Sequence, residues 1–110
     1  MEKVLRELSQ LPRNIEPIYT PWNEYAWKYS DFPELLRYFQ ENAYIVLGGD
    51  ILTMELKYTY DNWYYNPDPF DSKEENVRRS IAAAEDYLTK YKNRNGTDFY
   101  IVFVVTRRFP

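Results

Sequence analysis

Residues 72–105 read SKEENVRRSIAAAEDYLTKYKNRNGTDFYIVFVV, and this stretch decides the fold class. Ser72 followed by Glu75 matches a capping box, which starts a helix. Apolar side chains then recur at helical spacing at Val77, Ile81, Ala84, Leu88 and Tyr91. Asn95-Gly96 ends the helix, and residues 99–105 follow as a strand that is apolar on both faces, as central strands are. A long helix before a buried strand indicates an α+β domain.

Two shorter helices are expected before this stretch. Residues 2–11 carry apolar side chains at helical spacing and stop at Pro12. A second helix starts near Asp31 and ends near Asn42. The connector between them allows two interpretations, a helix that begins at Thr20 or a short edge strand. The strand is slightly favoured by the alternation of aromatic side chains at Tyr25, Trp27 and Tyr29.

Strand patterns occupy the middle of the chain. Residues 45–47 are apolar, and apolar and polar side chains alternate over residues 52–60, so that one face meets the core and the other meets water. The segment Gly48-Gly49-Asp50 between them is expected to be a structural hairpin turn or bulge. Its carboxylate would cap nearby N–H groups. An anion-binding nest is the less favoured alternative, because no further phosphate-binding pattern follows.

Composition bounds the architecture and excludes several classes of protein. The 110 residues suit one domain, with an antiparallel or mixed sheet of three to four strands and helices packed on it. Cysteine and histidine are absent, which excludes disulfides, thiol nucleophiles and imidazole chemistry. The net charge of −3 favours neither nucleic acid nor an anionic membrane. No apolar run is long enough for a membrane span, so a cytoplasmic protein is expected. No metal or cofactor is expected either, because the cysteine and histidine ligands and the EF-hand pattern are absent.

The chain is rich in aromatic residues, and these point to a binding surface. Its 12 tyrosines exceed what a core can bury with each hydroxyl hydrogen-bonded. They concentrate with asparagine and aspartate over residues 58–71, a composition typical of protein-binding surfaces. The candidate binding residues are Asp61, Trp63, Tyr64, Tyr65, Asp68, Phe70 and Asp71. A core strand packed on the helices explains the same aromatic residues equally well.

Charge and the remaining reactive groups narrow the function. Residues 61–76 hold five carboxylates against Lys73 alone, a local charge of −4 that could meet a basic partner, although a solvated loop and a helix N-terminus would carry the same residues. Asp50 and Asp61 could act as general acid and base, but nothing in their spacing brings them together. The sequence therefore favours a binding protein over an enzyme. The alternative class is a small carbohydrate- or peptide-binding module that uses Trp63 and the tyrosines as a stacking platform.

Short motifs over residues 25–105 resemble immunity protein family 40. They are Ala26-Trp27, Asp31, Leu35-Leu36, Val46-Leu47-Gly48-Gly49-Asp50-Ile51-Leu52, Tyr60-Asp61-Asn62-Trp63-Tyr64-Tyr65, Ser80, Tyr87 and Tyr91. Residues 1–24 carry no part of the pattern. The resemblance implies a cytoplasmic bacterial α+β protein that binds and neutralises a toxin domain encoded nearby. Polymorphic toxin systems, including contact-dependent growth inhibition, use such proteins.

Overall fold

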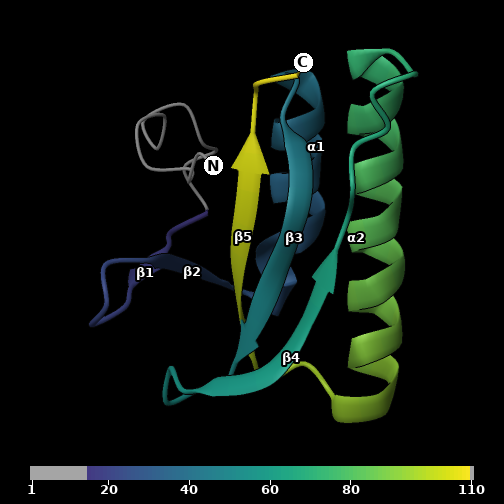
Figure 1. Cartoon of the computed structure of the whole chain (residues 1–110). Helices are drawn as coiled ribbons and strands as arrows, with labels where there is room; N and C mark the ends of the chain where they lie inside the picture. Colours follow the sequence, from purple (N-terminus) through teal and green to yellow (C-terminus); the bar gives the residue numbers. More distant parts are fainter. Residues whose placement is uncertain (1–14, 110) are drawn as a thin grey trace.

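A computed structural model describes residues 15–109, which form a five-stranded antiparallel sheet with two helices on one face (Figure 1). The strands are β1 (Ile18–Tyr19), β2 (Tyr25–Lys28), β3 (Ile45–Leu52), β4 (Tyr58–Tyr64) and β5 (Tyr100–Thr106). The helices are α1 (Phe32–Glu41) and α2 (Lys73–Asn95), and a short 3-10 turn (Tyr29–Asp31) leads into α1. The strand order is β1-β2-β5-β3-β4. The α+β class is confirmed, but the sheet has five strands where three or four were predicted. The additional strand is β1, whose two residues are too few to show an alternation of apolar and polar side chains.

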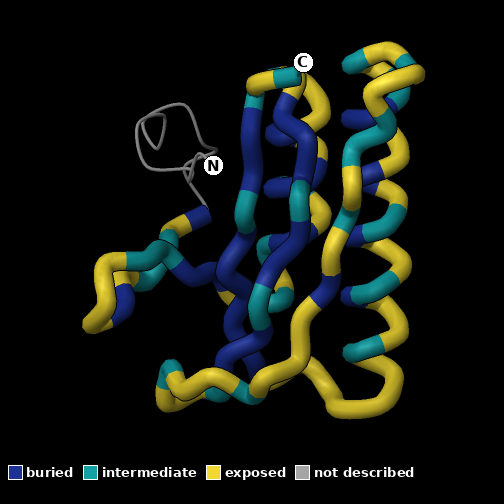
Figure 2. The backbone as a smooth tube through the Cα atoms, in the orientation of Figure 1, coloured by how far each residue is buried: buried dark blue, intermediate teal, exposed yellow. Residues whose placement is uncertain are grey.

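The core lies between the helices and one face of the sheet (Figure 2). The apolar stripes of both helices are buried: Leu35, Leu36 and Phe39 on α1, and Val77, Ile81, Ala84 and Leu88 on α2. Tyr91, the last residue of the stripe predicted for α2, is half-buried. They meet Ile101, Phe103 and Val105 of β5. A smaller cluster of Ala26, Leu52, Tyr100 and Val102 lies on the opposite face. The strand β5 is central and buried on both faces, as its composition predicted.

The β3–β4 hairpin differs most from the prediction. The expected hairpin turn at residues 48–50 is wrong, because β3 continues through them to Leu52. The turn lies at residues 53–57, inside the segment predicted as one alternating strand. Leu56 adopts a positive φ of 63° there, and Thr53 Oγ1 accepts hydrogen bonds from the backbone N–H groups of Glu55 and Lys57, both at 3.2 Å. The bulge alternative has support on the other side of β3, where the register with β5 shifts between Val46 and Gly48.

The connector and the helix ends follow local signals more closely. The strand interpretation of residues 25–29 is confirmed as β2, but β2 is not at the edge because β1 pairs with its outer side. Thr20 starts a turn and no helix, since its Oγ1 accepts a hydrogen bond from the Glu24 N–H at 3.0 Å. Ser72 caps α2 as predicted, accepting from the Glu75 N–H at 3.0 Å.

The helix expected over residues 2–11 lies outside the described residues. Neither described helix is long and apolar enough to cross a membrane.

Candidate functional site

The seven candidate binding residues lie on β4 and on the 65–72 loop that joins β4 to α2 (Figure 1). The structure gives them different environments. Tyr64 and Phe70 are 79% and 97% exposed, whereas Trp63 is only 7% exposed. Tyr65, Asp68 and Asp71 are half-buried in a network of polar contacts. The aromatic segment is therefore neither wholly core nor wholly surface.

Trp63 belongs to the core, which corrects its selection as a binding residue. Its ring stacks on Tyr87 at a centroid distance of 5.0 Å and meets Phe103 edge to face at 5.9 Å. Across the strand pair it lies over Gly49, where a Cβ atom would come within 2.5 Å of the ring. Glycine therefore makes room for the indole at this position. Since the ring is covered, Trp63 offers no stacking platform at the surface.

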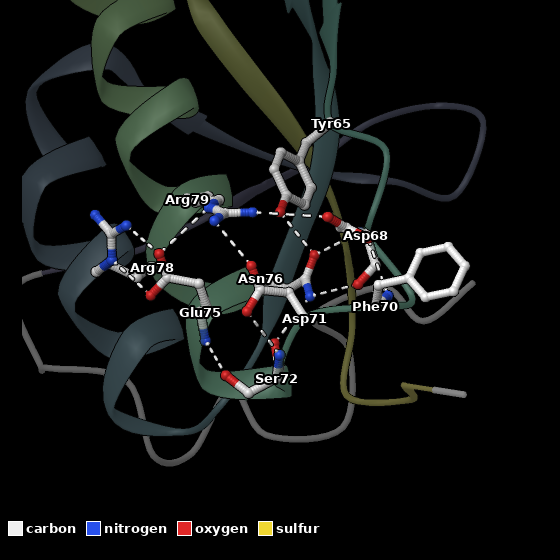
Figure 3. Close-up of polar contacts among 9 residues, drawn as sticks. All are labelled: Tyr65, Asp68, Phe70, Asp71, Ser72, Glu75, Asn76, Arg78 and Arg79. Atoms are coloured by element: carbon white, nitrogen blue, oxygen red, sulfur yellow. Dashed lines mark hydrogen bonds and ion pairs between the residues drawn. The ribbon is translucent and has the colours of Figure 1, made fainter.

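Asn76 holds the 65–72 loop in one shape (Figure 3). This side chain is 0% exposed. Its Nδ2 donates to the carbonyl oxygens of Asp68 and Ser72, at 3.0 and 2.8 Å. Its Oδ1 accepts from the Asp68 N–H and the Tyr65 hydroxyl, both at 2.7 Å. The amide therefore uses both donors and both acceptor sites, so the loop is fixed by a satisfied buried polar group.

Sequence reasoning missed Asn76, although a signal for it is present. Asn76, Ser80 and Ala84 repeat at a spacing of four residues, and all three are buried on the sheet-facing side of α2. A polar residue on that stripe predicts a buried hydrogen-bonding role. Ser80 has such a role too, because its hydroxyl accepts from the Val46 N–H at 2.9 Å.

The acidic cluster is partly neutralised by arginines of α2 (Figure 3). Arg79 pairs with Asp71 at 2.8 Å and with Glu75 at 3.3 Å, and its guanidinium lies 4.0 Å from Asp68. Arg78 also pairs with Glu75, and this hydrogen bond lowers the pKa of the Glu75 carboxyl. Adding these two arginines to the local charge of −4 leaves −2. The local charge of −4 counted over residues 61–76 therefore overstates the negative charge at this surface.

Asp61 lies on the helix side of β4. Its Oδ2 accepts a hydrogen bond from the Tyr91 hydroxyl at 2.9 Å. Burial, and then this hydrogen bond, raises the pKa of Tyr91. Together with Lys90 and Arg94, these side chains line a groove of about 400 Å³ between β4 and α2. The groove carries charges of both signs.

Asp50 lies on the opposite face of the sheet, in register with Asn62 and Val102. It accepts no hydrogen bond from any residue between 15 and 109, so the expected capping role has no contact to support it. Burial, and then the negative charge of Glu24, raises the pKa of its carboxyl. Asp50 and Asp61 therefore do not converge as an acid and base pair.

A second aromatic group joins the β1–β2 and β3–β4 turns. Trp22 stacks on Tyr58 with ring centroids 5.2 Å apart. Glu24 Oε1 accepts hydrogen bonds from the Trp22 indole and the Tyr58 hydroxyl, at 2.8 and 2.6 Å. Burial and the bonded carboxylate raise the pKa of Tyr58 to about 12. The stacked rings and the two hydrogen bonds to Glu24 therefore connect the β1–β2 turn to the β3–β4 turn.

Comparisons with known proteins give one match. No curated protein and no solved structure matches the chain. The family model described as immunity protein 40 matches residues 13–105. The match begins 12 residues before the stretch from 25 to 105 that the sequence motifs indicated, and it includes β1 to β4, β5 as far as Val105 and nearly all of the connector. The chain belongs to the immunity protein 40 family.

Proposed function

We propose that this protein is a bacterial immunity protein that binds and neutralises a cognate toxin domain encoded nearby, in the cytoplasm of the cell that makes both. Polymorphic toxin systems and contact-dependent growth inhibition are the settings in which such a pair acts. Membership of the immunity protein 40 family supports the class of function. Neutralisation by binding requires a shaped surface and no chemistry from the immunity protein itself.

The observation that carries the proposal is an exposed aromatic ring on an ordered loop. The Phe70 ring is 97% exposed and points away from the polar network (Figure 3). Its backbone N–H donates to Asp68 Oδ1 at 2.9 Å, and Asn76 fixes Asp68 in turn. Because the loop is already ordered, little conformational entropy remains to be lost on docking. A rigid, exposed aromatic side chain is the kind of residue that anchors an interface.

The other exposed or half-buried candidate residues have different parts in the proposed surface. Tyr64 supplies a second exposed ring at the end of β4. Asp68 and Asp71 supply charge at the rim, where it affects the association rate more than the affinity. Tyr65 supports the loop through the hydrogen bond from its hydroxyl to Asn76, and Asp61 lines the neighbouring groove. The alternative function, a carbohydrate- or peptide-binding module, would have to use other rings, because Trp63 is covered.

Calorimetry with the toxin domain encoded beside the gene tests the proposal. We expect a stable one-to-one complex, with an ordinary interface of about 1,600 Å² in total. Phe70→Ala should weaken binding by about tenfold or more, as removal of an anchor does. Met54→Ala, which removes an exposed apolar side chain at the distant β3–β4 turn, is the matched control. Micromolar or weaker binding to every toxin domain of its own locus would contradict the proposed function.

A further inference from the structure

Gly48 leaves a gap in the sheet face that the helices do not cover. Its cross-strand neighbours are Tyr64 on β4 and Val104 on β5, so two side chains flank a position that has none. A side chain cannot occupy this position, because a Cβ atom at Gly48 would collide with the Trp63 carbonyl oxygen and its φ is 151°. The gap is therefore a fixed feature of the strand register.

Asp50 lies at one end of this gap. It is the next residue of β3 on the same face, with Asn62 opposite it on β4. Its half-buried carboxylate has no hydrogen bond or ion pair with the described part of the chain. Burial, and then the negative charge of Glu24, disfavour its ionised form and raise the pKa of this carboxyl. A cation placed beside Asp50 would relieve this cost.

These residues form a slot with apolar walls and a negative end. Its volume is about 330 Å³, and Pro67 of the 65–72 loop also lines it. We name it the Gly48 slot. An aliphatic stem placed between Val104 and Tyr64 would contact the apolar walls, while a positive head group would meet Asp50. The Tyr64 ring adds a face on which a cation is attracted to the π electrons. A neutral apolar side chain would instead leave the carboxylate desolvated without a partner, which is unfavourable.

We propose that the Gly48 slot binds a lysine or arginine side chain presented by the partner protein. That the partner is a toxin domain rests on the proposed function. The preference of the slot for a cation with an aliphatic stem rests on the register, burial and charge described above. Asp50 is then a recognition residue, at a position where the sequence favoured a structural carboxylate.

The preference for a cation is tested first on the full chain alone. Titration with n-butylguanidinium and n-butylammonium, followed by NMR, should shift the signals of Gly48, Asp50 and Val104. The affinity for both cations should exceed that for neutral n-butylurea at least fivefold, and Asp50→Asn should abolish this preference. Glu85→Gln, which removes one exposed carboxylate from α2, should retain it. Equal affinity for the cations and butylurea, or a preference unchanged in Asp50→Asn, would overturn the proposal.

The neighbouring toxin domain tests whether the partner uses the slot. Asp50→Asn should lower its affinity at least tenfold, and Glu85→Gln should change it less than twofold. If the wild-type protein binds no toxin domain, the proposed function fails, while the butylguanidinium titration still decides whether the slot selects cations. If the toxin domain binds wild type and Asp50→Asn equally well, the slot has no part in recognition. That result refutes this inference and leaves the proposed function standing.

Discussion

The 65–72 loop and the Gly48 slot are neighbours, since Pro67 of the loop lines the slot, yet their carboxylates have opposite environments. In the loop, Asp68 accepts from the Phe70 N–H, and Asp71 pairs with Arg79 at 2.8 Å. In the slot, Asp50 is half-buried and has no such partner among residues 15–109. A satisfied polar group contributes to stability, whereas an unsatisfied one costs stability and suggests a role outside the fold. Substitutions in the two regions should therefore affect different properties.

Asn76→Ala should have the largest effect on folding. It leaves the Tyr65 hydroxyl and the Asp68 N–H without their acceptor and removes one of the two donors to each of the Asp68 and Ser72 carbonyl oxygens, so we expect a loss of about 3 kcal/mol in the free energy of unfolding. Urea unfolding measures this loss. Asn93→Ala, on an exposed position of the same helix, should cost less than about 0.5 kcal/mol. Equal effects of the two substitutions would refute the role given to Asn76.

Gly49→Ala should come next. The new methyl group would lie 2.5 Å from the Trp63 ring and 2.6 Å from the Val102 carbonyl oxygen, so overpacking should cost about 2 kcal/mol. Denaturant unfolding of the single variant and of a double variant with Trp63→Leu gives the coupling between the two positions. We expect the double variant to lose less than the sum of the two single losses, because the smaller side chain makes room. Strict additivity would count against this packing.

The double change Asp68→Asn with Asp71→Asn tests the surface charge of the loop. Because Arg79 already offsets part of this charge, we expect association with the toxin domain to slow only about threefold at low salt. Stopped-flow kinetics at about 50 and 300 mM salt, over which screening increases, measure the effect. An association rate that this double change leaves unaltered at both salt concentrations would place the binding surface elsewhere, such as the outer face of α2 or the connector around Trp22.

Asp50→Asn should have the smallest effect on stability. Since the pKa of Asp50 is raised above 3.8, the folded state binds this proton more tightly than the unfolded state does. The ionised carboxylate therefore destabilises the fold as pH rises from 3.8 through its folded pKa, and it has no such effect below both values. We expect Asp50→Asn to be neutral or stabilising at pH 7, within about 0.5 kcal/mol, by urea unfolding. A loss of 1 kcal/mol or more would show that Asp50 has a structural partner.

Local signals explain which elements could be predicted. The capping box at Ser72 and the apolar stripe from Val77 to Leu88 are contained within α2, so its start and its buried face follow from the sequence alone. The Leu35–Phe39 stripe of α1 is equally local. Both helices are accordingly where the pattern indicated.

The β3–β4 hairpin was mispredicted because its glycines serve tertiary contacts. Gly48-Gly49 looks like a turn, but these glycines accommodate the backbone and ring of Trp63 on the neighbouring strand. The actual turn uses Leu56 with a positive φ, which β-turn statistics do not favour. Charge was misjudged for a similar reason, because Arg79 lies outside the linear window and pairs with Asp71 inside it. Trp63 is buried and Phe70 is exposed, although both are aromatic residues of the same segment. This difference depends on which residues surround each ring in space, and the local sequence does not contain that information.

The clamp formed by Asn76 has an evolutionary consequence. It holds the 65–72 loop through main-chain groups of Asp68 and Ser72 and through the Tyr65 hydroxyl, while the ring of Phe70 takes no part. A substitution at position 70 would therefore change the surface presented to a partner and leave the fold intact. Selection can therefore change binding specificity at position 70 by single substitutions. The protein can follow a partner whose surface diverges without first acquiring substitutions that increase its stability.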